Sequence, residues 1–304
     1  MTSRSDDLER MLKTLIPAWI SHPLGVTKIS GGMTNENFWV QVADEGFFVR
    51  LGGEGAEQLG IDRDVEYLAT VTAGDLGVAP LVRHYLREQR ILITNYVLGR
   101  TLSSDELSQP WCMEQVVELL QKIHHTAPAV TSFSVFHVIR QYWDLVRTAP
   151  LIDRQAIEAA LTIAERIEAC LPFQPAGLCH NDLLAANFVL DPKSARIWLV
   201  DWEYAGLGTP YFDLGNFASN QQLLPSQEET LARLYFKESE VQPHVAAIRL
   251  MRVMSDLREA LWGSVQRLVS PLDFDFEQYA RDHFYRVQHA VQSAAVEQAL
   301  QILE

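Results

Sequence analysis

The first hundred residues combine two kinds of hydrophobic spacing. Apolar residues recur at helical intervals in Leu8–Ile20 and again in Asp62–Ala73, which predicts two helices. Short apolar or alternating runs bounded by glycine and polar residues predict strands. These runs are Phe38–Val42, Phe47–Leu51, Leu81–Tyr85 and Ile91–Tyr96. The pattern therefore predicts the order strand, strand, strand, helix, strand, strand, a small antiparallel sheet with a helix inserted before its last hairpin.

Most of the remaining chain has helical spacing. Apolar positions three and four residues apart predict helices over Met113–His125, Arg154–Cys170, Gln227–Phe236, His244–Leu268 and Asp275–Leu303. We predict that Val97–Arg100 is the hinge between the two parts, since no internal repeat or low-complexity linker is present. The sequence thus predicts an α+β fold with two lobes, residues 1–96 and residues 97–304.

The composition narrows the class of partner. The 304 residues are 48% hydrophobic, which is enough for a large core, and 25 basic against 39 acidic residues give a net charge of −14. This charge repels nucleic acid and anionic membranes and suits a small cation, although an acidic surface also simply favours solubility. The three cysteines lack metal-ligand spacing, and we find neither a signal peptide nor an apolar stretch of membrane-spanning length. We therefore expect a cytoplasmic protein without a nucleic-acid or membrane partner.

The segment His180–Asn187 carries the clearest chemical pattern. Asp182 is followed five residues later by Asn187, and the apolar run Ile197–Val200 ends at Asp201. A kinase needs an aspartate that accepts the proton of the substrate hydroxyl, and oxygen ligands that hold Mg²⁺ on the nucleotide phosphates. The order of these residues therefore predicts phosphoryl transfer, with Asp182 as the catalytic base and with Asn187 and Asp201 as metal ligands.

These segments resemble the choline/ethanolamine kinase family of the aminoglycoside phosphotransferase superfamily, whose members share the protein-kinase-like bilobal fold. Residues 180–183 are similar to the family's catalytic loop, and Asp201–Tyr204 is similar to its metal motif. Tyr211–Phe217 and Leu272–Ala280 resemble further choline-kinase segments. The resemblance implies ATP and Mg²⁺ as cofactors, an N-lobe sheet, a mostly helical C-lobe, and Glu203 as a third metal-binding residue.

The resemblance also implies which residues contact the nucleotide. Arg50 ends the third strand, where protein kinases carry the phosphate-binding lysine, and Glu66 would be its partner in an ion pair. A surface salt bridge is the alternative for this pair. Four further residues, Gly32, Met33, Thr34 and Asn35, belong to a loop similar to the Gly-Gly-Met-Ser-Asn loop of choline kinases and would contact the phosphates. Two more, Asn95 and Val97, would lie near the adenine edge.

Aromatic residues would select the acceptor, because a quaternary ammonium is recognised by ring faces and carboxylates. Tyr204, Trp262, Phe274 and Tyr279 match positions that line the choline pocket, with core packing as the alternative for each. Glu259 stands where choline kinases often have another tryptophan, and its carboxylate suits a cation with N–H donors. The sequence predicts an ATP-dependent kinase for choline or a related amino alcohol. The alternatives are a thiamine, aminoglycoside or other cationic-alcohol kinase and a non-catalytic nucleotide-binding module.

Overall fold

The computed structural model describes residues 4–29, 34–53, 55–149 and 154–304. The chain forms two compact units. Unit 1 comprises Met1–Arg100 and Val189–Glu203, and unit 2 comprises Thr101–Phe188 and Tyr204–Glu304. The division into lobes at residues 1–96 and 97–304 stays a prediction.

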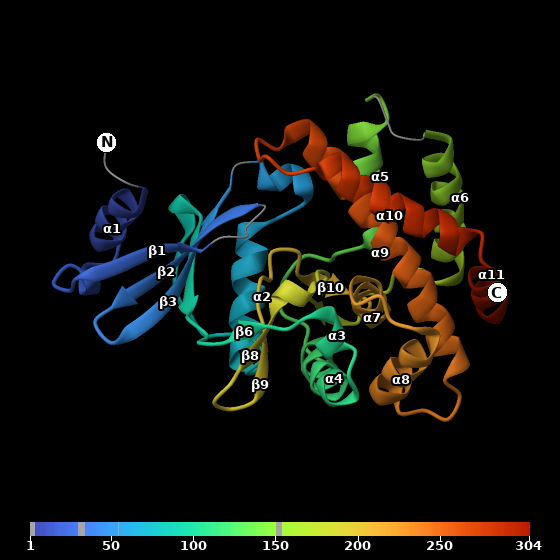
Figure 1. Ribbon diagram of the computed structural model, residues 1–304, viewed down its shortest axis with the longest axis horizontal. Helices are drawn as coiled ribbons and strands as arrows, with labels where there is room; N and C mark the ends of the chain where they lie inside the picture. The colour runs from blue at the N-terminus through green and yellow to red at the C-terminus, as the bar shows by residue number, and fades with distance from the viewer. Residues whose placement is uncertain (1–3, 30–33, 54, 150–153) are drawn as a thin grey trace. The chain divides into compact units, whose positions relative to one another are not determined.

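Unit 1 contains a five-stranded antiparallel sheet with the order β1-β2-β3-β5-β4 (Figure 1). Its strands are β1 (Leu24–Ile29), β2 (Asn35–Val42), β3 (Glu45–Gly52), β4 (Val82–Leu86) and β5 (Ile91–Asn95). Phe38, Val40 and Val42 alternate along β2 and are buried, as the spacing predicts. β1 is the first of the three strands expected before the helix, but the spacing does not locate it, because Thr27 and Lys28 interrupt the apolar alternation.

Two helices of unit 1 begin and end for identifiable reasons. α1 (Arg4–Leu15) packs on β1 and ends before Pro17, so the prediction that it continues to Ile20 was wrong. Pro17 instead begins a short 3₁₀ turn, since proline has no N–H for a continuing helix. α2 (Arg63–Asp75) begins after Asp62, whose side chain accepts hydrogen bonds from the N–H groups of Asp64 (2.9 Å) and Val65 (3.2 Å).

A second, three-stranded sheet has the order β6-β8-β9. It consists of β6 (Arg100–Thr101), β8 (Phe188–Asp191) and β9 (Arg196–Leu199).

Unit 2 is mostly helical. Its helices are α3 (Ser104–Leu107), α4 (Pro110–His124), α5 (Val135–Val146), α6 (Arg154–Cys170), α7 (Pro210–Asn220), α8 (Pro225–Phe236), α9 (Gln242–Val269), α10 (Phe276–Val291) and α11 (Ala294–Leu303). α9 packs against α5, α7, α10 and α11 and is the central helix of the unit (Figure 1). Two short strands, β7 (Gly177–Cys179) and β10 (Gly206–Gly208), pair antiparallel. β7 precedes the His180–Asn187 segment in the sequence, and β10 follows it. The α+β architecture predicted from the sequence is therefore confirmed.

The C-terminal region corrects one prediction. The single helix expected over Asp275–Leu303 is two helices, α10 and α11, because the chain turns at Ser293. The Ser293 hydroxyl donates to the carbonyl of Ala290 (2.6 Å) and accepts from the N–H of Val296 (3.4 Å), which caps α11.

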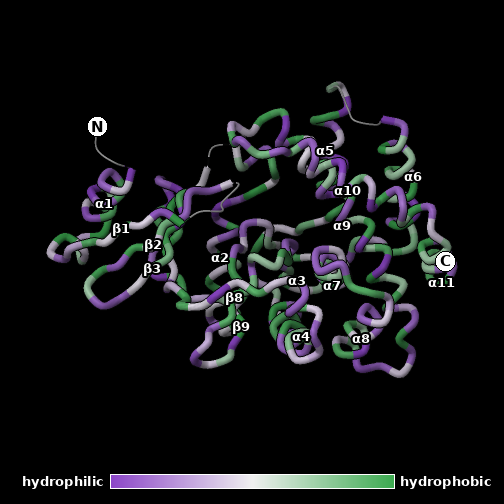
Figure 2. Tube along the Cα trace, viewed as in Figure 1, coloured by the Kyte–Doolittle hydropathy of each residue, from purple (hydrophilic) through white to green (hydrophobic). Residues whose placement is uncertain are grey.

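Hydrophobic and hydrophilic residues alternate along α10 in Figure 2, as expected for a helix with one buried face. None of the helices in the described part of the chain combines the length and apolar character that a membrane crossing needs.

Candidate active site

The segment that follows β7 is held by side chains of α7. The carboxylate of Asp213 accepts hydrogen bonds from the backbone N–H groups of His180 (2.9 Å) and Asn181 (2.7 Å). Asn216 accepts one from the N–H of Leu183 (2.6 Å). Asn181 has a φ of 64°, a left-handed conformation that asparagine tolerates. These bonds orient the backbone on both sides of Asp182. Because Asp182 is the predicted base, we call residues 180–187 the catalytic loop.

Asp182 lies within this loop with 9% of its surface exposed. The amide of Asn187 donates to the Asp182 carbonyl (2.8 Å) and to its carboxylate oxygen Oδ2 (3.4 Å). His180 accepts from the Asp182 N–H through Nδ1 (3.3 Å). The two predicted residues Asp182 and Asn187 are therefore in contact, and His180 supports the loop from within.

Arg258 of α9 is a residue that sequence reasoning missed. Its Nη2 donates to Oδ1 of Asp182 (3.2 Å), and its Nε donates to Oε1 of Glu259 (2.9 Å). The guanidinium carbon lies 5.4 Å from the ring centroid of Tyr204 and 5.8 Å from that of Phe212. Burial acts to lower the pKa of Arg258, but the charges of Glu259 and Asp182 outweigh it, so the pKa is raised. Three charged residues, Asp256, Arg258 and Glu259, interrupt an apolar stretch of a long predicted helix, and this was the signal available in the sequence.

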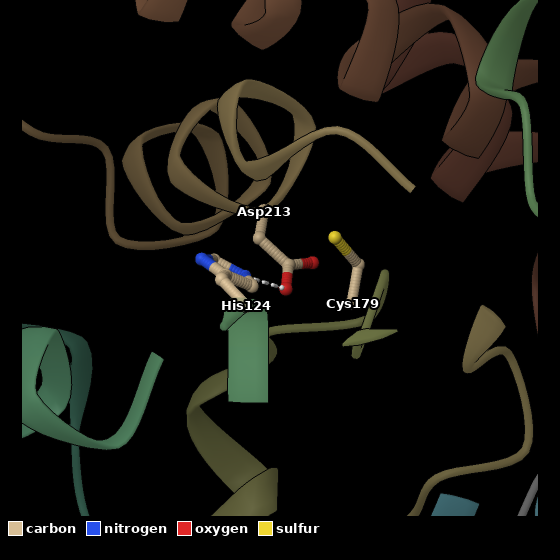
Figure 3. A group of neighbouring side chains, drawn as sticks. All are labelled: His124, Cys179 and Asp213. Atoms are coloured by element: carbon tan, nitrogen blue, oxygen red, sulfur yellow. Dashed lines mark hydrogen bonds and ion pairs between the residues drawn. The ribbon is translucent and has the colours of Figure 1, made fainter. Parts of the chain in front are cut away.

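Asp213, which binds the catalytic loop, lies close to two further buried side chains, His124 and Cys179 (Figure 3). Nε2 of His124 lies 2.9 Å from Asp213, and Nδ1 shares a hydrogen bond of 2.7 Å with the hydroxyl of Tyr235. Burial raises the pKa of the Cys179 thiol well above its usual value. Both ring nitrogens of His124 already have hydrogen-bond partners, which leaves neither available to a metal ion, so these residues support the loop.

The predicted acceptor residues form a connected group within unit 2. Trp262 donates from Nε1 to the Tyr204 hydroxyl (3.0 Å), and its ring centroid lies 5.5 Å from that of Tyr279. The Tyr279 hydroxyl donates to Oε2 of Glu259 (2.7 Å). Phe274 is 46% exposed, and its centroid lies 6.2 Å from that of Tyr279. The structure thus brings four of these residues together and leaves Phe274 at the edge of the group.

Glu259 does not present an unengaged carboxylate. Burial acts to raise the pKa of its carboxyl, but the Arg258 guanidinium more than offsets this effect and the pKa is lowered. Burial, together with the Glu259 charge, raises the pKa of Tyr279 well above its usual value, so Tyr279 remains a hydrogen-bond donor. Glu259 is therefore an anion held between Arg258 and Tyr279.

In unit 1, arginines hold the predicted nucleotide and metal residues. Arg50 forms ion pairs with both Glu66 and Asp201. Arg63, which the sequence analysis did not select, donates from Nη1 to Glu66 (2.6 Å) and Glu203 (3.2 Å). Its spacing of three residues from Glu66 on α2 was the available sequence signal. Asp201 has a φ of 68°, and its side chain is 35% exposed.

Glu203 is buried as well, with 7% of its surface exposed. Oε1 accepts from the Thr34 hydroxyl (2.7 Å), and Oε2 accepts from the Asn35 amide (2.9 Å). The amide oxygen of Asn35 in turn accepts from Arg63 (2.7 Å). Burial first and the Asp201 charge second raise the pKa of Glu203. Thr34 and Asn35 therefore contact the second carboxylate of the Asp-Trp-Glu segment.

Four predicted nucleotide residues remain to be placed. Gly32 and Met33 lie outside the described residues. Asn95 ends β5, where it pairs with Phe47 and donates its N–H to the carbonyl of Leu81 (2.9 Å). Val97 follows β5 and is partly exposed. The roles of all four in adenine or phosphate binding stay predictions.

Comparison with known proteins shows the family. Residues 25–249 match the model of the phosphotransferase enzyme family. Ethanolamine kinase 2 from Mus musculus is 27% identical over 300 residues, covering 89% of this chain and 77% of the relative. A choline/ethanolamine kinase family protein from Mesorhizobium loti has a TM-score of 0.83 at 26% identity, covering 98% of both chains.

A more distant likeness concerns the fold alone. Aminoglycoside 2′-phosphotransferase-IIIa in its GDP complex has a TM-score of 0.69 at 14% identity, covering 94% of this chain and 99% of the other. The protein-kinase-like fold predicted from the sequence is confirmed, as is the resemblance to choline and ethanolamine kinases. The chain belongs to the phosphotransferase enzyme family and is a phosphotransferase with an alcohol group as acceptor.

Proposed function

We propose that the protein transfers the γ-phosphoryl group of ATP to the hydroxyl of ethanolamine, choline or a closely related amino alcohol. The observation that carries this proposal is the connected group of Asp182, Arg258, Glu259, Tyr279 and Trp262 within unit 2. A carboxylate that can accept a hydroxyl proton is thereby linked through hydrogen bonds and ring contacts to groups that suit a cation. An amino alcohol has these two features, a hydroxyl and a positive charge.

Asp182 is the proposed base, which orients the acceptor hydroxyl and accepts its proton during attack on the γ-phosphorus. Arg50, paired with Glu66, is the proposed ligand of the nucleotide phosphates. Thr34 and Asn35, together with Gly32 and Met33 of the same loop, are proposed to contact the phosphates through backbone N–H groups. Asn95 and Val97 are proposed to lie near the adenine.

The proposed metal is Mg²⁺, and the donor chemistry fits it. Asp201 and Glu203 offer carboxylate oxygens, and Asn187 uses its amide nitrogen toward Asp182 and so retains its amide oxygen as a ligand. When bound, Mg²⁺ neutralises charge on the nucleotide phosphates. Burial raises the pKa of Glu203 and thereby favours the neutral carboxyl group. A bound cation would act in the opposite direction and favour the ionised carboxylate that binds it.

The charge of the cluster formed by Asp182, Arg258 and Glu259 favours a cationic acceptor. Asp182 and Glu259 provide two carboxylates against the single guanidinium of Arg258, which leaves one negative charge. Trp262 and Tyr204 offer aromatic rings, whose faces attract cations with about 0.5–2 kcal/mol each. Each oxygen of a carboxylate can accept two hydrogen bonds, so Oε2 of Glu259, which accepts from Tyr279, retains capacity for one N–H group of an ammonium. We therefore propose that ethanolamine is preferred over choline, which has no N–H group.

A panel assay tests this function. The protein, Mg²⁺ and ATP are mixed with ethanolamine, N-methylethanolamine, choline, thiamine or an aminoglycoside, and acceptor-dependent ADP release is measured. We expect turnover of the amino alcohols, with kcat/KM falling from ethanolamine to choline. Turnover confined to thiamine or the aminoglycoside would replace the acceptor class. ATP binding without turnover of any acceptor would favour a regulatory module.

A further inference from the structure

Asp182 is held on both edges of its carboxylate, and only one of the two holders belongs to the catalytic loop. Asn187 reaches Oδ2 (3.4 Å) from the loop, whereas Arg258 reaches Oδ1 (3.2 Å) from α9, 76 residues away in sequence. Arg258 also donates through Nη1 to the backbone carbonyl of Asn181, which precedes Asp182. One guanidinium thus bonds the backbone before the proposed base and the carboxylate of the base itself.

The Arg258 side chain has little freedom to leave this arrangement. It is 3% exposed, and the carboxylate of Glu259 accepts from both Nε and Nη2. The rings of Tyr204 and Phe212 lie within 6 Å of the guanidinium carbon. The guanidinium is planar, and its N–H groups point in fixed directions. The hydrogen bonds to Glu259 and to the Asn181 carbonyl therefore determine the direction of the N–H group that reaches Asp182.

We infer that Arg258 is a positioning residue that sets the orientation of the Asp182 carboxylate, with Glu259 as the counter-ion that orients Arg258. This inference rests on the proposed function, since it takes Asp182 as the catalytic base. Arg258 acts through Asp182 and contacts neither ATP nor acceptor in this assignment. A base whose oxygen is misplaced by about 1 Å can lose about 10²-fold in rate, which is why a buried charge here is useful despite the cost of its desolvation.

Kinetics of Arg258→Met and Arg258→Lys test the inference against a matched control, Arg252→Met. Arg252 lies on the same helix and also bonds a backbone carbonyl (Leu223, 2.8 Å) and a carboxylate (Glu228, 2.7 Å), but the described residues show no contact between it and the catalytic loop. We expect Arg258→Met to lower kcat by about 10- to 100-fold with an unchanged KM for Mg·ATP. Arg258→Lys, which keeps the charge without the planar fork, should recover part of this loss. Arg252→Met should keep the wild-type kcat.

A double variant separates positioning from general support of the fold. In the Asp182→Asn background, Arg258→Met should cause no further loss of kcat, because there is no base left to orient. Multiplying losses in the double variant would instead mean that Arg258 acts independently of Asp182 and would overturn the inference. Wild-type kcat in Arg258→Met while Asp182→Asn is inactive would overturn the inference alone. Full activity of Asp182→Asn would overturn the proposed base, and with it the proposed mechanism.

Two further measurements keep the inference testable under less favourable outcomes. If Arg258→Met does not fold, Arg258→Lys decides, and wild-type kcat in that variant would refute the need for the guanidinium fork. If no acceptor is turned over, the urea midpoints of Arg258→Lys, Asp182→Asn and the double variant are compared. Non-additive shifts of these midpoints are then expected, and strictly additive shifts would show that the two side chains are not coupled.

Discussion

The arginine–carboxylate cluster that contains Asp201 lies in unit 1, the one that contains Asp182 lies in unit 2, and the two differ in what surrounds the charges. The unit 1 cluster contains Arg50, Arg63, Glu66, Asp201 and Glu203. The unit 2 cluster contains Asp182, Arg258 and Glu259. In unit 1 the side chain of Asp201 is 35% exposed, whereas no side chain of the unit 2 cluster exceeds 12%.

This difference separates two uses of the same residue types. A cluster with an accessible carboxylate can exchange an arginine contact for a metal or a phosphate, so we expect the unit 1 cluster to govern nucleotide affinity. A cluster packed between Tyr204 and Phe212 cannot rearrange without exposing or orphaning a charge. We therefore expect the unit 2 cluster to govern the chemical step. Each prediction below tests whether this division holds.

The largest expected effect is that of Asp182→Asn. The substitution preserves size and most hydrogen bonds but removes the proton acceptor, so kcat should fall by about 10²–10⁴-fold. Calorimetric titration should show wild-type affinity for Mg·ATP. A variant with normal kcat and weakened nucleotide binding would reverse the roles assigned to the two clusters.

Arg63→Met should destabilise the protein. Arg63 bonds Glu66, Glu203 and Asn35, so its loss leaves buried carboxylates with fewer partners, and the free energy of unfolding should fall by about 3 kcal/mol. Urea unfolding measures this change. Arg87→Met, which removes an exposed partner of Asp64, is the control and should leave the urea midpoint nearly unchanged. Equal midpoints for the two variants would mean that the unit 1 cluster does not depend on Arg63.

Asp201→Ala should weaken nucleotide binding rather than the chemical step. We expect the Kd for Mg·ATP to rise by about tenfold or more, corresponding to about 1.4 kcal/mol or more of lost interaction. Isothermal titration with Mg·ATP gives this Kd directly. Asp64→Ala removes a carboxylate of the same unit that is paired only with surface groups, namely Tyr85 and Arg87, and serves as the control. An unchanged Kd in Asp201→Ala would exclude this carboxylate from metal binding.

The smallest expected effect concerns the acceptor. Trp262→Ala should raise the KM for the amino alcohol by an amount corresponding to about 0.5–2 kcal/mol, without changing the KM for ATP. Trp262→Phe keeps an aromatic face but loses the hydrogen bond to Tyr204, so its KM for the amino alcohol should lie between the values of the wild type and of Trp262→Ala. Steady-state kinetics with ethanolamine and with choline measure both changes. If neither variant alters the acceptor KM, Trp262 is a core residue and the aromatic selection of the acceptor is wrong.

Several features were predictable because they depend on neighbouring residues. The strands β2, β3, β4 and β5 and the helix α2 follow from local spacing, and the order of Asp182, Asn187 and Asp201 in the sequence indicates the phosphotransferase family. α7 was not predicted, because almost all of its residues are buried and it therefore lacks the polar face that makes a helix periodic in sequence. The turn at Ser293 was missed because a capped break between two helices leaves their hydrophobic spacing nearly continuous.

Motifs a few residues long encode the family, the reaction class and several local elements, so these could be predicted from the sequence. The partners of the charged residues became known only from the folded structure. Glu259 illustrates this point, because the sequence suggested an acceptor-binding carboxylate but contained no sign that Arg258 and Tyr279 also bind it. The contact between Arg258 and Asp182 joins residues 76 positions apart. Such contacts depend on how α9 packs against α7 and α10, and packing of this kind is a property of the folded chain that no local pattern contains.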